Sequence, residues 1–251
     1  MASLYGTAFA IPLFAQGVLG TSATNSGLIL MPFMLTAIGG SVLSGLALTL
    51  TGKYKWVAIL GVVIDIVGTL MLVCLNASSS SSYTQLLVAM LVLGLGVGSG
   101  LSVYTTVVQN VYPKKIGEAS STLVFFRQLG GTIGLAAMGS VLVSSYVPAF
   151  HAALPDTLRH FLPTSILSAF DNPLILLSPE ALSHIHAGFA GYGVQGMTAF
   201  NILLQAVKTG LAQSVHNVFV LSLVIILFGL IAVLFLKEIP LRERKKADQY
   251  P

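Results

Sequence analysis

Charged side chains are scarce in this sequence. Of its 251 residues, only 8% are Asp, Glu, Lys or Arg, whereas 55% are hydrophobic, and the mean hydropathy is +0.90. A soluble domain carries about 25% charged residues, so the composition excludes an ordinary soluble protein and indicates an integral membrane protein. The net charge of +4 does not point to nucleic acid, because the positions of the basic residues have a simpler explanation in the membrane.

Residues that could form disulfide bonds, bind metal ions or catalyse reactions are also few. The single cysteine, Cys74, cannot form an internal disulfide. All five histidines fall in or at the end of one connection, and His184 and His186 have poor spacing for metal ligands on a helix. Neither a phosphate-binding loop nor a nucleophile elbow is present. We therefore expect a protein that is not an enzyme, with no cofactor and no metal.

The apolar segments predict an all-α membrane protein with six transmembrane helices. The first five occupy residues 1–146, and the sixth occupies residues 216–236. Between them, residues 147–215 form a long connection, which prolines from Pro148 onward interrupt. Its later part, residues 196–215, has apolar residues at helical spacing and either lies on the membrane surface as an amphipathic helix or extends the last span. Residues 237–251 are a basic tail.

Basic residues are concentrated on one side of these predicted spans. Nine of the 12 fall in the turns after the second and fourth spans or in the tail: Lys53, Lys55, Lys114, Lys115, Lys237, Arg242, Arg244, Lys245 and Lys246. Lysine and arginine accumulate in cytoplasmic loops. We therefore expect a multi-pass protein of the cell membrane with both termini cytoplasmic and the long connection outside.

Two charges, Asp65 and Arg127, lie well inside predicted spans. Each lies about 13 Å from the cytoplasmic end of its span, measured from Trp56 and Glu118 at 1.5 Å per residue. Such burial is costly, so the two can pair, and a carboxyl group in apolar surroundings suits a proton carrier. The alternative for Asp65 is a structural partner or a conformational lock. For Arg127, a gate or helix-contact role ranks ahead of substrate contact.

Small residues mark two helices for close packing. Gly94, Gly96, Gly98 and Gly100 alternate along the fourth span and place two small-xxx-small pairs on adjacent faces. After Arg127, three glycines leave little bulk on one side of the fifth span and form a candidate helix-packing signature: Gly130, Gly131 and Gly134.

Three stretches resemble the C-terminal half of a 14-span drug:proton antiporter of the major facilitator superfamily. They are FAIPLFAQGVLGTSATNSGLILMP at 9–32, GLALTLTGKYK at 45–55 and VQNVYPKKIGEASSTLVFFRQLGGTIG at 108–134. The resemblance covers essentially the whole chain. It implies proton-coupled multidrug efflux by alternating access between two pseudo-symmetric halves, with a small amphiphilic or lipophilic substrate, protons and the lipid bilayer as partners.

One half alone cannot carry out alternating access, because this mechanism needs two halves that move relative to each other. The resemblance therefore implies either a fragment or truncated reading frame, or a half that pairs with a second polypeptide or with a copy of itself. A different hypothesis is a non-transporting six-span interaction protein that associates with a separate transporter half.

The resemblance also implies which residues meet substrate. The first and fourth helices line the central cavity in this family, which makes candidates of Gln16, Tyr104, Gln109 and Asn110. Phenylalanines can add aromatic walls to such a site, namely Phe9, Phe14, Phe125 and Phe126.

The superfamily's cytoplasmic loop motif is represented by Gly45, Gly52, Lys53 and Lys55. Thr49 and Leu50 stand where that motif often has an acidic residue and a basic one, so its charge relay is absent.

Overall fold

The computed structural model describes residues 2–75, 82–155, 158–159, 167–168, 170–172, 179–191 and 193–236, and its architecture is all-α. Its helices are α1 (Ala2–Gly17), α2 (Ala23–Thr51), α3 (Tyr54–Val73), α4 (Ser82–Val111), α5 (Ile116–Ala153), α8 (Pro179–Ala190) and α9 (Gly193–Leu234). Five of them are long and apolar enough to cross a membrane: α2, α3, α4, α5 and α9. The predicted all-helical membrane class is confirmed.

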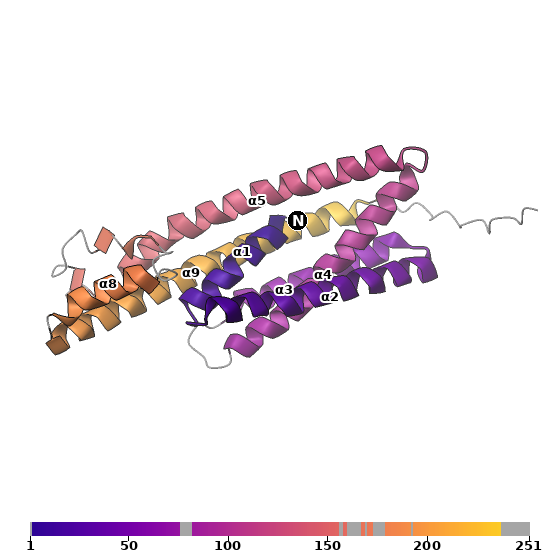
Figure 1. The fold of residues 1–251 in the computed structure, drawn as a ribbon. Coiled ribbons are helices and arrows are strands. Elements are labelled where there is room, and N and C mark those ends of the chain that lie inside the picture. The colour runs from indigo at the N-terminus through magenta and orange to yellow at the C-terminus, as the bar shows by residue number, and fades with distance from the viewer. Residues whose placement is uncertain are drawn as a thin grey trace, which may run out of the picture.

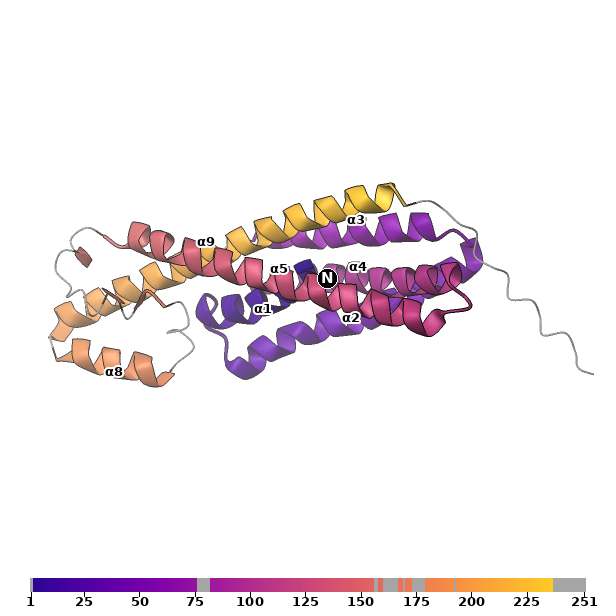
Figure 2. The same ribbon diagram turned by 90° about the horizontal axis from the view of Figure 1, so that it is seen from above.

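The remaining expected span is shorter than a membrane crossing. Helix α1 has 16 residues, which at 1.5 Å per residue gives about 24 Å against a hydrocarbon core of about 30 Å. Its start lies roughly half-way along the bundle (Figures 1 and 2). In the described residues, the expected six spans are therefore five helices of spanning length plus α1.

Two helices run further than the sequence suggested. Helices α5 and α9 contain 38 and 42 residues, about 57 and 63 Å at 1.5 Å per residue. Residues 196–215 belong to α9, so this segment extends the last span. Pro148, expected to begin the connection, lies inside α5. A proline removes one helical hydrogen bond, but Tyr146 and Phe150 are completely buried on either side and hold the helix in place.

The turns that follow α2 and α4 and the C-terminus of α9 lie at one end of the bundle, which we call the lysine end because these turns carry Lys53 and Lys114 (Figure 1). At the opposite end, the last turns of α5, the first turns of α9 and helix α8 pack together beyond the other helices (Figures 1 and 2). We call this part the cap. The basic tail and residues 76–81 lie outside the described residues.

Side-chain bonds hold the cap together. The Tyr146 hydroxyl donates a hydrogen bond of 2.8 Å to the Phe170 carbonyl oxygen. His151 Nε2 lies 3.0 Å from Asp171 Oδ1. At Gly210 of α9, a β-carbon would lie 2.8 Å from the backbone nitrogen of Phe150, so the long helices touch backbone to backbone. Much of the expected long connection is therefore ordered helix.

The alternation of glycines along α4 predicted small residues on two adjacent faces, and these faces meet two different helices. Added β-carbons at Gly94 and Gly98 would collide with carbonyl oxygens of α2, whereas one at Gly96 would lie 2.6 Å from the backbone nitrogen of Asp65 in α3. Helices α2 and α3 consequently pack on α4 with almost no side chain between the backbones. This contact fixes the position of Asp65.

Helix α5 is covered along only one stripe. Its buried residues recur every three or four positions along the face toward α1 and α9: Gly131, Gly134, Met138, Leu142, Tyr146 and Phe150. Large apolar side chains remain exposed on its other faces, including Phe125 at 60% and Ile133 at 63%. In a bilayer such faces contact lipid or another protein.

Candidate functional site: a cavity lined by two charges inside the spans

The two charges inside the spans lie at the same depth. Asp65 comes eleven residues after Tyr54, where α3 begins, and Arg127 comes eleven residues after Ile116, where α5 begins. Both helices begin at the lysine end (Figure 1), so each α-carbon lies about 16 Å into its helix.

Asp65 and Arg127 line one open cavity of about 460 Å³ between α1, α3, α4, α5 and α9. Tyr104 and Phe126 contribute aromatic walls, and the rest of the lining is aliphatic or glycine: Leu4, Gly61, Val62, Gly96, Val97, Gly100, Leu123, Gly130, Ile225, Ile226 and Gly229. The volume falls within the range of small-molecule sites. Of these lining residues, the two charged side chains and Tyr104 are the polar ones.

Asp65 has one oxygen with no polar partner. Its Oδ1 is buried without a hydrogen-bond partner in the part of the chain that the structure describes. Its backbone is held by Gly96 of α4 and by Thr69, whose hydroxyl donates to the Asp65 carbonyl oxygen over 2.9 Å. A bare carboxylate in such surroundings is costly, whereas a protonated carboxyl group is much less so.

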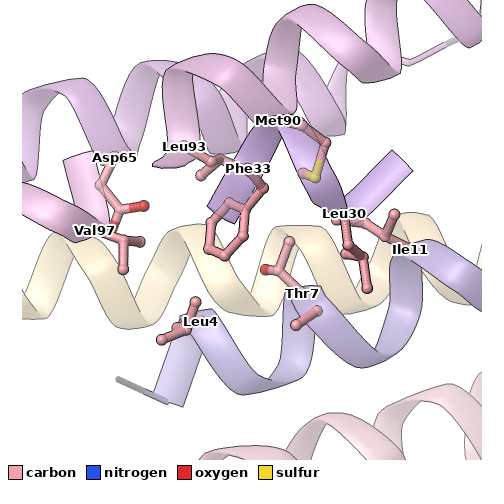
Figure 3. A pocket seen from close by; sticks show the side chains of 10 residues that line it. Leu4, Thr7, Ile11, Leu30, Phe33, Asp65, Met90, Leu93 and Val97 are labelled. Carbon is pink, nitrogen blue, oxygen red and sulfur yellow. The ribbon is translucent and has the colours of Figure 1, made fainter. Parts of the chain in front are cut away.

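A second, much smaller cavity touches the same carboxyl group. It has a volume of about 10 Å³, close to the smallest that holds one water molecule. Figure 3 shows Asp65 at its edge, with Thr7 of α1 among the otherwise apolar side chains around it. Asp65 therefore stands between a large cavity and a site the size of a single water.

Arg127 points toward a different partner. Its Nη2 donates to Thr105 Oγ1 of α4 at 3.4 Å. No ion pair joins it to Asp65, since no such contact occurs within 4.0 Å between these two described residues. The pairing that the sequence allowed is not made in this conformation, although the two side chains share a cavity.

The expected substrate-cavity residues are distributed more widely. Tyr104 lines the cavity, but Gln16, Gln109 and Asn110 are not among its lining residues. Gln16 Nε2 donates to Ser26 Oγ over 2.7 Å, and Gln109 Nε2 donates to Ser120 Oγ over 3.2 Å. These two amides connect neighbouring helices.

The expected aromatic residues are divided between two helices of the bundle. Phe126 lines the cavity and packs edge-to-face against Phe125, with ring centroids 5.5 Å apart. Of the two on α1, Phe14 is buried and Phe9 is 48% exposed.

The residues of the expected loop motif form the turn between α2 and α3. Gly52 ends α2 in the left-handed conformation, with φ of +66°, and its N–H donates to Leu48 O. Lys53 is the exposed residue before α3, and Lys55 is partly buried. Gly45 lies within α2, seven residues before Gly52, and a β-carbon there would be 3.5 Å from Ser102 Oγ.

The three glycines after Arg127 have different surroundings. A β-carbon at Gly131 would overlap the ring of Tyr5 in α1, and Gly134 is buried. Gly130 lines the cavity, and an added β-carbon there would meet nothing within 4 Å. Two of these glycines therefore lie on packed surfaces, and the third leaves open space one turn from Arg127.

Several polar contacts were missed from the sequence. Thr105 is the partner of Arg127, Tyr5 Oη donates to Gln128 Oε1 over 2.8 Å, and the buried hydroxyls of Thr7 and Ser222 lie 3.5 Å apart. Gln128 adjoins Arg127 in the resembling stretch, which was an available signal. No pattern in the sequence marked Thr105, Thr7 or Ser222 as a contact residue.

Histidines show no metal centre among the described residues. His151 pairs with Asp171, the His186 ring lies against Phe200 with centroids 5.3 Å apart, and His216 borders a separate hollow. Within the described ranges, no three His, Cys, Asp or Glu side chains come together to hold a metal ion. His160 and the His184 side chain lie outside what the structure describes.

Comparison with known protein families shows to which family this helical bundle belongs. The Major Facilitator Superfamily model matches residues 1–155, more than half of the chain. The chain belongs to the Major Facilitator Superfamily. The match covers α1 to α5, which supply most of the cavity lining, so the cavity lies within the superfamily's helical bundle.

The alignments with curated relatives in the superfamily also cover α9. The chain is 30% identical to "Multidrug transporter protein MdtP" of Bacillus subtilis (strain 168) over 98% of its own length and 45% of that protein. It is 29% identical to "Tetracycline resistance determinant" of Streptomyces rimosus, over 94% of the chain and 68% of that protein. It is 26% identical to "Multidrug resistance protein 3" of Bacillus subtilis, over 94% and 44%. The chain thus spans under half the length of two of these relatives.

Proposed function

We propose that this chain is the C-terminal half of a 14-span multidrug:proton antiporter of the Major Facilitator Superfamily. In this proposal, α1 and the five longer helices are the six spans of that half. The lysine end faces the cytoplasm, and the cap lies outside the cell. The transported compounds are small lipophilic or amphiphilic molecules, and protons drive their export.

One observation carries the proposal. Nearly the whole chain, 98%, aligns with only 45% of a multidrug transporter, which is the relation expected of one half to a two-half protein. Alternating access requires two halves that move about a central site. The remaining half is therefore the partner that we propose, either as upstream sequence of the same protein or as a second chain.

The exposed surface supports this partner. Helix α2 exposes a continuous series of large apolar side chains, and α5 is buried along one stripe only. Near the exposed edge of α1 and α5, the hydrogen bond between Tyr5 and Gln128 places polar groups among apolar ones. A surface of this kind suits a substrate path between two halves.

Efflux of ethidium, a fluorescent lipophilic cation, tests the proposal in cells. We compare this chain alone with a chain that carries the restored upstream coding sequence, each with and without a proton uncoupler. Efflux that needs the restored half and stops with the uncoupler supports the proposal. Uncoupler-sensitive efflux by the chain alone contradicts the need for a second half.

The same cells distinguish a non-transporting interaction protein. Two results together would favour that role. The restored chain would show no proton-linked efflux of any tested amphiphile, and this chain would co-purify with a separate transporter whose activity it changes.

A further inference from the structure

We propose that the hollow bordered by Cys74 and His216, which we call the α3 hollow, binds the headgroup of a phospholipid whose acyl chains lie along the exposed faces of α3 and α9. The α3 hollow shares no lining residue with the cavity of Asp65 and Arg127. Lipid binding there goes beyond the proposed function and requires no transport. Its assignment to the outer leaflet rests on the proposed function, through the orientation of the lysine end.

The depth of the α3 hollow in the membrane follows from the length of its helix. Helix α3 has 20 residues, about 30 Å at 1.5 Å per residue, which matches the thickness of the hydrocarbon core. Near the lysine end of this helix, Trp56 is 63% exposed, and tryptophan is enriched at membrane surfaces. Cys74 caps the opposite end and lines the α3 hollow. The hollow therefore lies at the level of the lipid headgroups.

One wall of the α3 hollow is polar. The hollow has a volume of about 400 Å³ and lies between α1, the end of α3 and the middle of α9. Thr209, Gln213 and His216 line it from α9, and their spacing of four and three residues puts them on one face of that helix. Among the described residues that line the hollow, none is acidic, and His216 is the one that can carry a positive charge. This wall suits a negatively charged group with several acceptor oxygens.

Two of these side chains have hydrogen-bond donors available for a ligand. The Thr209 hydroxyl already donates to the Gln205 carbonyl oxygen over 2.9 Å. The Gln213 amide nitrogen lies 3.5 Å from Asn217 Oδ1, a long contact that a better acceptor can replace. The His216 ring carries a second N–H donor. A phosphate group can accept from both, because its negative charge strengthens each hydrogen bond.

Apolar surfaces continue from the α3 hollow toward the lysine end. Helices α3 and α9 pack side by side (Figure 2). On α3, exposed apolar side chains at helical spacing lead up to Cys74: Trp56, Leu60, Val63, Val67 and Leu70. On α9, the face that carries His216 continues as exposed apolar side chains: Val220, Val224, Leu227 and Ile231. This face of α9 therefore changes from polar to apolar where the α3 hollow ends.

A phospholipid has the same profile, with a phosphate at one end and two acyl chains at the other. A purely apolar molecule would leave the donors of Gln213 and His216 without acceptors. A free anion would leave both apolar faces uncovered, and a lipophilic cation would find no acidic side chain in the lining. A bound phospholipid would contact both α3 and α9 at the point where α9 continues into the cap.

Cys74 is a natural reporter of the α3 hollow, because it is the single cysteine of the chain, is exposed and lines the hollow. The purified chain in dodecyl maltoside micelles receives increasing mole fractions of dioleoyl phosphatidylglycerol. Intact-mass spectrometry then follows the rate at which N-ethylmaleimide modifies Cys74. We expect the rate to fall severalfold and to reach a plateau. Dioleoylglycerol, which has the same chains without a phosphate, and inorganic phosphate alone should leave the rate unchanged.

A matched pair of double variants on α9 tests the polar wall. Gln213→Leu with His216→Leu should raise the mole fraction of phosphatidylglycerol needed for half-maximal slowing by about tenfold, because hydrogen bonds to a charged group are strong. Asn201→Leu with Gln205→Leu changes exposed polar residues of the same helix that do not line the hollow, so that mole fraction should not change. Each rate is compared with the rate of the same variant without lipid.

Native mass spectrometry of the unaltered chain provides a measurement that needs no substitution. We expect one phosphatidylglycerol molecule to be retained per chain and dioleoylglycerol to be lost. Equal retention of both, or retention of neither, would overturn the lipid site.

The labelling rates can also contradict the proposal. Equal slowing by phosphatidylglycerol and dioleoylglycerol would show that the headgroup is not recognised. Slowing by ethidium but not by phosphatidylglycerol would assign the α3 hollow to a transported compound. Equal half-maximal mole fractions in the two double variants would overturn the role of Gln213 and His216.

The same labelling with the upstream sequence restored separates this proposal from the proposed function. Lipid protection of Cys74 in a restored protein without efflux would refute the proposed function alone. Proton-coupled efflux by a restored protein whose Cys74 no lipid protects would refute the lipid site alone.

Discussion

Gly96 of α4 and Asp65 of α3 touch backbone to backbone: a β-carbon on Gly96 would lie only 2.6 Å from the Asp65 nitrogen. A backbone atom cannot move aside as a flexible side chain can. The position of Asp65 therefore depends on the absence of a side chain at Gly96 in the neighbouring helix.

Replacing Gly96 should therefore destabilise the bundle. We expect Gly96→Val to lower the free energy of unfolding by roughly 1–3 kcal/mol, the usual cost of overpacking. Gly139→Val, which has no heavy atom within 4 Å of its β-carbon, is the control. Thermal unfolding in detergent measures both. Equal melting temperatures for the two variants would show that α3 and α4 do not cross at this point.

The cap provides a second prediction, concerning a single hydrogen bond. Tyr146→Phe removes the donor to the Phe170 carbonyl in a fully buried site. An unsatisfied buried carbonyl costs about 1–3 kcal/mol, so we expect faster hydrogen exchange in the last turns of α5. Tyr83→Phe, at an exposed position, is the control. Unchanged exchange in Tyr146→Phe would mean that the cap is held by its apolar contacts alone.

A third prediction tests where the other half binds. In a Cys74→Ser background, Phe9→Cys on α1 and Phe228→Cys on α9 place single thiols at exposed sites. We expect a water-soluble maleimide to label Phe9→Cys less once the upstream half is restored, because that half covers the α1 side. Labelling of Phe228→Cys should not change. Protection of Phe228→Cys instead would place the other half against α9 and contradict the proposed arrangement.

A fourth prediction concerns the role of Asp65 in transport. In the restored protein, we expect Asp65→Asn to reduce uncoupler-sensitive ethidium efflux at least tenfold, since an amide cannot bind and release a proton. Asp65→Glu keeps the titrating group and should retain part of the activity. Full efflux with Asp65→Asn would assign the coupling proton to another residue.

The sequence predicted those features of the fold that depend on local pattern. The apolar runs marked the spans, and the alternate glycines of α4 indicated two adjacent faces for close packing. The structure packs Gly94 and Gly98 against α2 and Gly96 against α3. The C-terminal end of α5 could not be placed, because Pro148 and the polar residues near it are typical of a loop. Tertiary packing of Tyr146 and Phe150 overrides that local preference. For residues 196–215, helical spacing alone did not decide between a surface helix and an extension of the last span.

The site was harder to predict than the spans. Asp65 and Arg127 were conspicuous as charges within apolar runs, but whether they meet depends on how five helices cross, which no local pattern specifies. Gln16 and Gln109 looked like cavity residues, yet each finds a serine on the next helix. Thr105 could be recognised only once α4 and α5 were seen side by side.

Transport by purified protein tests the central claim most directly. Proteoliposomes containing the protein with its upstream half restored, and proteoliposomes containing this chain alone, are given the same imposed pH gradient, and ethidium movement is followed by fluorescence. Our account predicts gradient-driven ethidium movement with the restored protein and none with this chain alone. Equal gradient-driven movement in both would contradict the account, because it would make this chain a complete transporter and not one half of one.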